Sequence, residues 1–274
     1  MFKWLAHLIG SQIIRFLETK SPYYEPFSIT DPMKLRDCLR PADVLLVEGN
    51  QRISAIIKYM TQSTWSHAAI FVGDALGRTT EDGEPLELVE ALADEGVVAA
   101  PLSKYGRFNT RICRPATLTE ADRRRVVDYA VASLGRVYDT RNVIDLMRYL
   151  IPFPPVPVRW RRRMLALGSG DPTRAICSTL IAQAFEDVRF PILPHIEKHS
   201  ERTQAGDYLE AEIYHIRHHS LYTPRDFDVS PYFAVVKPTL ETGFDYKAFR
   251  WTDRPQSPAA ISELTRQWAR SGSA

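Results

Sequence analysis

The chain has 274 residues, of which 45% are hydrophobic and 25% charged, an ordinary globular composition with enough apolar material for one sizeable core. Its net charge of +2 excludes a strong general attraction to nucleic acid. The three cysteines have no CxxC spacing, which argues against a disulfide framework or a zinc site. No apolar run reaches the roughly 18 residues of a membrane span, and no clean signal peptide is present. We therefore expect an intracellular, cytoplasmic protein.

Residues 2–18 have the pattern of an amphipathic helix, with apolar side chains along one face and polar ones along the other. Such a helix could lie on a membrane surface, which would make the protein peripheral on the inner membrane surface. It could equally dock on the rest of the chain or on a second subunit. With the loop that follows, it forms a predicted N-terminal segment, residues 1–36.

A buried strand is predicted from Ser66 to Val72, bounded by a glycine and following a shorter strand at residues 42–47 and a helix that Asn50 would cap. Strand periodicity places His67 on one face with Ala69 and Phe71. Most strand histidines are structural. The small residues beside this one leave the imidazole room for a neighbour.

The next predicted strand, residues 87–91, contains Glu90. A carboxylate near His67 would fix the imidazole tautomer and stabilise its charged form. Asp94 and Glu95 are competing candidates, but they fall in a turn. Further strands are predicted around residues 97–98 and 111–113, and Thr119 begins a helix with a capping-box pattern.

Residues 152–170 form a proline- and arginine-rich insertion, and its first part, Pro152 to Val158, cannot be helix because of its prolines. Its segment 153–163 combines apolar groups, a tryptophan and an arginine cluster, which suits contact with anionic lipid. The common alternative is a solvated basic insertion. Because it lies just before the next helix, it could also cover a site as a lid.

That helix is predicted over residues 175–185, with Cys177 near its N-terminus. The positive end of a helix dipole lowers the pKa of a thiol and favours the nucleophilic thiolate. The alternative is a small buried hydrophobic residue. A Cys–His pair is the minimal apparatus for thiol nucleophilic catalysis, because the imidazole takes the thiol proton and later protonates the leaving group.

Four motifs occur in a fixed order along the chain: Trp65-Ser66-His67-Ala68-Ala69-Ile70-Phe71-Val72-Gly73, Leu88-Val89-Glu90-Ala91 with Gly96-Val97-Val98, Gly135-Arg136-Val137-Tyr138-Asp139, and Ile176-Cys177-Ser178. The series resembles the circularly permuted papain-like proteins of the NlpC/P60 superfamily, specifically the YiiX/YebB-like amidase group. In that permuted branch the histidine strand precedes the cysteine helix, as here. The resemblance covers about residues 40 to 238.

The resemblance implies an α+β fold in which an antiparallel sheet packs against the catalytic cysteine helix. It implies a catalytic domain at residues 37–238, followed by a C-terminal extension at 239–274. Within that domain it implies Cys177 as nucleophile, His67 as general base and Glu90 as the acidic third residue. The predicted substrate-contacting residues are Tyr138, Trp65, Ser66 and Ser178.

The expected function is a cysteine-dependent hydrolase or acyltransferase that cleaves amide or ester bonds. Peptide, small-molecule or lipid-like substrates fit, with a tilt towards acylated or amphiphilic ones. No cofactor and no metal are implied, because the histidines between His195 and His219 have no recognised ligand spacing. The alternatives are a lipid- or ligand-binding papain-like protein with little turnover, and a membrane-associated scaffold. The substrate and the oligomeric state do not follow from the sequence.

Overall fold

The computed structural model describes residues 19, 24–27, 31–92, 95–137, 176–202, 208–215, 217–248 and 262. The chain divides into two compact units, residues 1–241 and 242–274. The predicted helix at 2–18 and the insertion at 152–170 lie outside the described residues, so both stay predictions. None of the described helices is long and apolar enough to cross a membrane.

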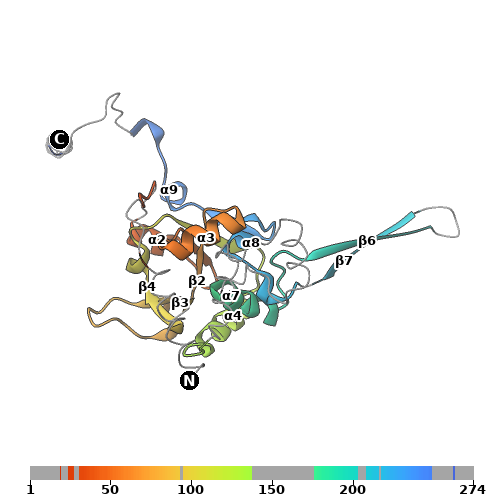
Figure 1. The fold of residues 1–274 in the computed structure, drawn as a ribbon, viewed down its shortest axis with the longest axis horizontal. Helices are drawn as coiled ribbons and strands as arrows, with labels where there is room; N and C mark the ends of the chain where they lie inside the picture. Colours follow the sequence, from red (N-terminus) through yellow and green to blue (C-terminus); the bar gives the residue numbers. More distant parts are fainter. Residues whose placement is uncertain are drawn as a thin grey trace, which may run out of the picture. The chain divides into compact units, whose positions relative to one another are not determined.

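The first unit is built around a six-stranded sheet in the order β4-β3-β2-β1-β5-β8, in which every neighbouring pair is antiparallel (Figure 1). Its strands are β1 (Val44–Val47), β2 (His67–Phe71), β3 (Leu86–Leu92), β4 (Gly96–Pro101), β5 (Thr110–Pro115) and β8 (Phe233–Val236). The predicted strands from residue 42 to residue 113 are confirmed, with shifts of a few residues at their ends. With the helices below, the chain is of the α+β class.

The α-helices are α2 (Pro32–Cys38), α3 (Arg52–Thr61), α4 (Glu120–Ala132), α7 (Ile176–Asp187), α8 (Pro224–Val229) and α9 (Pro238–Glu241). Short 3-10 turns are η1 (Gly73–Leu76), η2 (Leu102–Tyr105), η3 (His219–Leu221) and η4 (Tyr246–Ala248). Thr119 caps α4 as predicted, because its side chain accepts from the Asp122 N–H. The predicted Asn50 cap is wrong: Gln51 is the N-cap of α3 and makes no side-chain capping bond.

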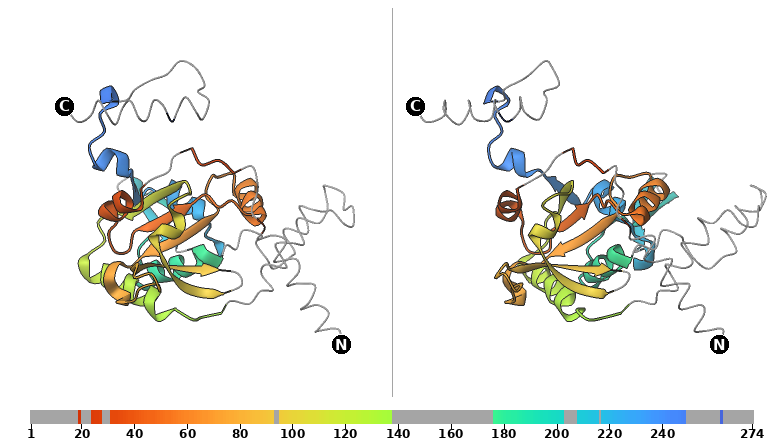
Figure 2. Two further views of the ribbon diagram at one scale, coloured as in Figure 1. Left: turned by 90° about the vertical axis from the view of Figure 1, so that its left-hand side faces the viewer. Right: turned by 60° about the vertical axis from the view of Figure 1, so that its left-hand side comes forward.

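The central strands are buried on both faces, which explains why they read as nearly continuous apolar runs. In β1, Val44 and Leu46 belong to a core that includes side chains of α4 and α7, whereas Leu45 and Val47 belong to a second core with side chains of α2 and η2. Figure 2 shows α4 and α7 on one face of the sheet and α2 on the other. The sheet therefore separates two cores, and β2 passes between them.

Strands β6 (His195–Arg202) and β7 (Tyr208–His215) pair only with each other and form a second, two-stranded sheet. The sequence pattern does not predict this hairpin. Its strands are rich in charged residues and histidines, so they lack the alternating apolar pattern that marks a strand packed on a core. The separate sheet explains the missing pattern, because neither strand joins the six-stranded sheet.

Candidate active site

His67 is the first residue of β2, and its side chain reaches the neighbouring strand β3. Ala69 pairs directly with Glu90, so His67 and Glu90 are diagonal neighbours on the same face of the sheet. The His67 Nε2 atom lies 2.6 Å from Glu90 Oε2. An ionised carboxylate can only accept a hydrogen bond, so Nε2 must carry the proton. The nitrogen left for a second partner is Nδ1.

Glu90 on β3 is completely buried, and an unpaired carboxylate would be costly there. Besides His67, it has two further donors, both on η2. The Lys104 Nζ atom lies 2.5 Å from Glu90 Oε1, and the Tyr105 hydroxyl donates to Oε2. Both carboxylate oxygens are thus engaged, which fixes the orientation of Glu90.

Cys177 is the second residue of α7, and α7 packs against β2 and β3. Only 6% of Cys177 is exposed. Its sulfur hydrogen-bonds to the His67 side chain and accepts from the backbone N–H of Ala68. The Ser178 hydroxyl lies 3.9 Å from the sulfur. The structure therefore brings Cys177, His67 and Glu90 together in one connected row, as the sequence motifs predict.

Burial and the neighbouring charges shift the pKa values of Cys177, His67 and Glu90 in opposite directions. Burial disfavours the charged imidazole, but the Cys177 and Glu90 side chains outweigh it and raise the pKa of His67 to about 10. Burial would also raise the pKa of Cys177, yet His67 and the hydrogen bonds to the sulfur bring it below its ordinary value. For Glu90, His67 and Lys104 overcome burial and lower the pKa to about 2. These shifts favour a thiolate, an imidazolium and a carboxylate.

The other two cysteines behave differently. Cys113 is fully buried in β5, where burial and the nearby Asp228 carboxylate raise its thiol pKa. Cys38 ends α2, where burial and the Glu241 carboxylate raise its thiol pKa. Among the three cysteines, Cys177 alone has the electrostatic surroundings of a nucleophile.

The predicted substrate-contacting residues are held by structural partners. Trp65 is 4% exposed, its indole N–H donates to Asp228 over 3.0 Å, and the Arg111 guanidinium stacks on its ring. The Ser66 hydroxyl is buried and accepts from the Gly49 N–H over 2.9 Å. These contacts support the site's architecture, so a role in substrate contact stays a prediction for both.

Ser178 and Tyr138 complete the predicted set. Ser178 is fully buried with its hydroxyl facing the Cys177 sulfur, a placement suited to the thiol rather than to open solvent. Tyr138 lies outside the described residues. Of the two carboxylates that competed with Glu90, Asp94 also lies outside them, and Glu95 is in a turn and exposed. The geometry therefore selects Glu90.

Lys104 and Tyr105 were not singled out from the sequence. They lie in the segment Pro101-Leu102-Ser103-Lys104-Tyr105-Gly106, where no strand or helix periodicity indicates which way a side chain points. Their part in the site depends on η2 folding back over the face of the sheet that carries Glu90. A proline and a glycine bounding a short polar turn were the only local signal.

No protein-family model matches the chain, and a search of curated proteins found no match. Among solved structures, the chain is similar to the metalloprotein yiiX from Escherichia coli O157:H7, with a TM-score of 0.42 and 14% sequence identity over 73% of this chain and 97% of that chain. Membership of the NlpC/P60 superfamily stays a prediction.

Within the residues that the structure describes, no three His, Cys, Asp or Glu side chains are grouped so that they could hold a metal ion. The described groups around Cys177 are instead linked by hydrogen bonds and opposite charges.

Proposed function

We propose that the chain is a cysteine-dependent hydrolase or acyltransferase that acts on amide or ester bonds through Cys177, His67 and Glu90. One observation carries the proposal: the buried Cys177 sulfur, the imidazole and a buried carboxylate are hydrogen-bonded in a row, and their pKa values are displaced towards a thiolate–imidazolium pair. A structural cysteine needs no such partner.

In the first half of the reaction, the Cys177 thiolate attacks the substrate carbonyl carbon and forms a tetrahedral intermediate. The backbone N–H groups at the start of α7 lie where the helix dipole is positive, which suits the developing oxyanion. As the intermediate collapses, the imidazolium of His67 donates its Nδ1 proton to the leaving amine or alkoxide. This leaves a thioester on Cys177 and a neutral His67.

In the second half, His67 acts as general base. Its Nδ1 takes a proton from water, giving hydrolysis, or from an alcohol or amine acceptor, giving acyl transfer. The acceptor attacks the thioester carbon and Cys177 leaves as the thiolate, which restores the starting pair. Glu90 remains ionised throughout and holds the Nε2–H tautomer, so that Nδ1 always faces the sulfur.

The fold that best accommodates this chemistry is the circularly permuted papain-like arrangement of the NlpC/P60 superfamily. The order of the parts supports it: the histidine strand β2 comes first, the acidic residue on β3 second, and the cysteine helix α7 last. An antiparallel sheet packed against the cysteine helix is the arrangement that this assignment requires.

The test is to trap the acyl-enzyme. The full chain is incubated with p-nitrophenyl esters of short and medium acyl chains and with an acyl p-nitroanilide, then quenched in acid. We expect an adduct of one acyl mass, mapped to Cys177 by mass spectrometry, and release of p-nitrophenol or p-nitroaniline. Added hydroxylamine separates acyl transfer from hydrolysis.

Two variants make this test specific. Cys177→Ala should lose the adduct and reduce turnover by at least about a thousandfold, because the nucleophile is gone. Cys38→Ala, which removes a half-buried thiol with a raised pKa, should behave as the wild type. Turnover that survives in Cys177→Ala, or an adduct mapped to another residue, would contradict the proposal.

A further inference from the structure

We propose that Lys104 and Tyr105 are positioning residues that act on Cys177 and His67 through Glu90, and that they set the pH range over which the thiolate is present. The inference rests on the proposed function, since it concerns how that same site is controlled. No sequence motif quoted above includes either residue.

The two oxygens of the Glu90 carboxylate bind different donors. Oε1 accepts from Lys104 over 2.5 Å. Oε2 accepts from both the Tyr105 hydroxyl and His67 Nε2. The Tyr105 ring also lies beside the imidazole, with the ring centroids 6.0 Å apart and the planes tilted by 40°. A rotation of Glu90 that released either η2 residue would therefore displace the His67 contact as well.

Lys104 also balances the net charge of the buried cluster. Glu90 is fully buried and faces His67 and Lys104. Among the described residues, Cys177 faces His67, the Ala68 amide and the Ser178 hydroxyl, and Tyr105 lies near enough to feel its charge. With thiolate, imidazolium and carboxylate alone, this buried cluster would carry one excess negative charge. The Lys104 ammonium cancels that charge, which lowers the cost of keeping an anionic sulfur in the interior.

Tyr105 contributes as a neutral donor. It is 6% exposed, and burial together with the Glu90 carboxylate raises its pKa well above the ordinary tyrosine value. The hydroxyl thus keeps its proton throughout the working pH range and always donates to Glu90. Its dipole stabilises the carboxylate without adding a charge, so its removal should have a smaller effect in the same direction as the removal of Lys104.

The test measures the pH dependence of iodoacetamide alkylation at Cys177 in the full chain, resolved by mass spectrometry. Lys104→Met should move the acid limb of this profile to higher pH by about half a unit, because a partly exposed cation has been taken from near the thiolate. The thiolate fraction on the acid side then falls about threefold. Tyr105→Phe should move the acid limb upward by less. Lys104→Arg keeps the positive charge, so its acid limb should coincide with that of the wild type.

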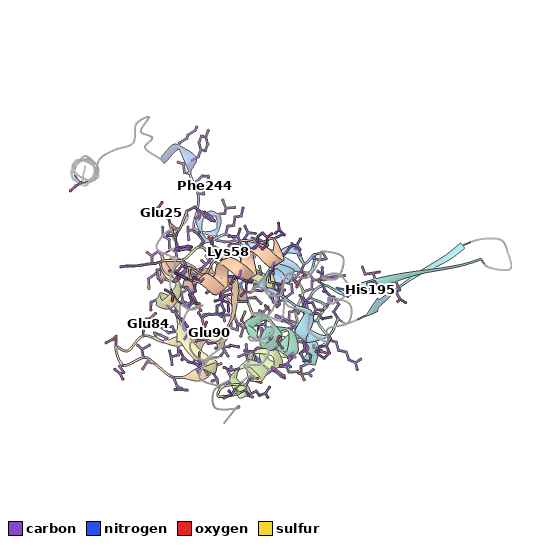
Figure 3. The ribbon with its side chains drawn as sticks, viewed as in Figure 1. Glu25, Lys58, Glu84, Glu90, His195 and Phe244 are labelled. Carbon is purple, nitrogen blue, oxygen red and sulfur yellow. The ribbon has the colours of Figure 1, made fainter. Side chains whose placement is uncertain are left out.

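Lys58→Met is the matched control. Lys58 on α3 makes a 2.8 Å ion pair with Glu48, so this variant also removes a partly buried lysine–glutamate pair. Figure 3 labels Lys58 and Glu90 on separate elements. A general loss of stability would affect Lys58→Met as much as Lys104→Met, whereas the proposed mechanism leaves the acid limb of Lys58→Met unchanged.

The two hypotheses fail in different ways. If wild-type Cys177 shows no reactivity below the ordinary thiol range, the proposed function fails and the inference fails with it. If wild-type Cys177 is reactive at low pH but Lys104→Met and Tyr105→Phe have the same acid limb as the wild type, the roles of Lys104 and Tyr105 are overturned and the proposed function stands. Should Lys104→Met not fold, Tyr105→Phe decides the matter, because it removes only the hydroxyl that donates to Glu90 and keeps the buried ring.

Discussion

At the scale of single residues, His67 and Glu90 define the pH range in which their interaction stabilises the fold. The pKa of His67 rises from 6.5 to about 10 on folding, so its contribution is complete below 6.5 and is lost as the pH rises through about 10. The pKa of Glu90 falls from 4.5 to about 2, so its contribution is present above 4.5 and is lost as the pH falls through about 2. Both contributions are complete between these two ordinary values.

Glu90→Gln tests the carboxylate itself. The amide can still accept the Nε2–H bond but carries no charge, so the imidazolium loses one of its buried counter-ions and keeps the Cys177 thiolate. We expect the alkaline limb of activity to move down by about one unit from the wild-type value. The rate should fall by about tenfold or more, because His67 is no longer held in its charged form.

Glu84→Gln is the matched control for that variant. Glu84 accepts from the Ser103 backbone N–H over 3.1 Å and also from the Ser103 hydroxyl, so it contacts the same η2 turn that binds Glu90 without belonging to the row of Cys177, His67 and Glu90. Its activity profile should match that of the wild type. Equal shifts in the two variants would mean that loosening η2, rather than loss of the Glu90 charge, is responsible.

At the scale of elements, the sequence predicts those parts that bury apolar side chains. Strands β1 and β2 appear as apolar runs because both of their faces are covered, and α4 is signalled by the Thr119 cap and its periodic apolar residues. The sequences of the hairpin β6–β7 and the turn η2 have no apolar periodicity of this kind, so the sequence does not indicate them. The hairpin strands pair only with each other, and η2 is placed by its contacts with Glu90 on β3.

The ion pair between Asp43 and Arg114 joins the start of β1 to β5, and it supplies a test at this scale. Asp43 is fully buried, and the Arg114 guanidinium donates to both of its oxygens, at 2.7 Å and 3.0 Å. Arg114→Met should lower the free energy of unfolding by about 3 kcal/mol, because it leaves a buried carboxylate without its cation. Urea denaturation monitored by circular dichroism measures this.

Arg124→Met serves as its control. Arg124 is 75% exposed and lies 3.5 Å from Glu120 on the same helix, an arrangement worth under about 0.5 kcal/mol. If the two variants lost the same stability, the Asp43 pair would not be the interaction that secures β1 against β5. The arrangement of β1 matters to the site because β1 pairs with β2 along its full length, ending at His67.

At the scale of the whole molecule, the candidate site exists only because three distant segments meet. Residues 67, 90 and 177 lie on β2, β3 and α7, and local periodicity alone could not establish that they touch. The ordered motifs selected the three residues through a family resemblance. Lys104 and Tyr105 were beyond that reasoning, because their role is visible only once η2 is placed against Glu90.

The most direct test of the account is the pH dependence of alkylation at each cysteine, compared between the wild type and His67→Ala. We predict that Cys177 reacts at pH ~6, well below the ordinary thiol range, while Cys38 and Cys113 do not, and that His67→Ala abolishes this reactivity. The result that would contradict the account is a Cys177 as inert at that pH as Cys113, or one whose low-pH reactivity survives the loss of His67.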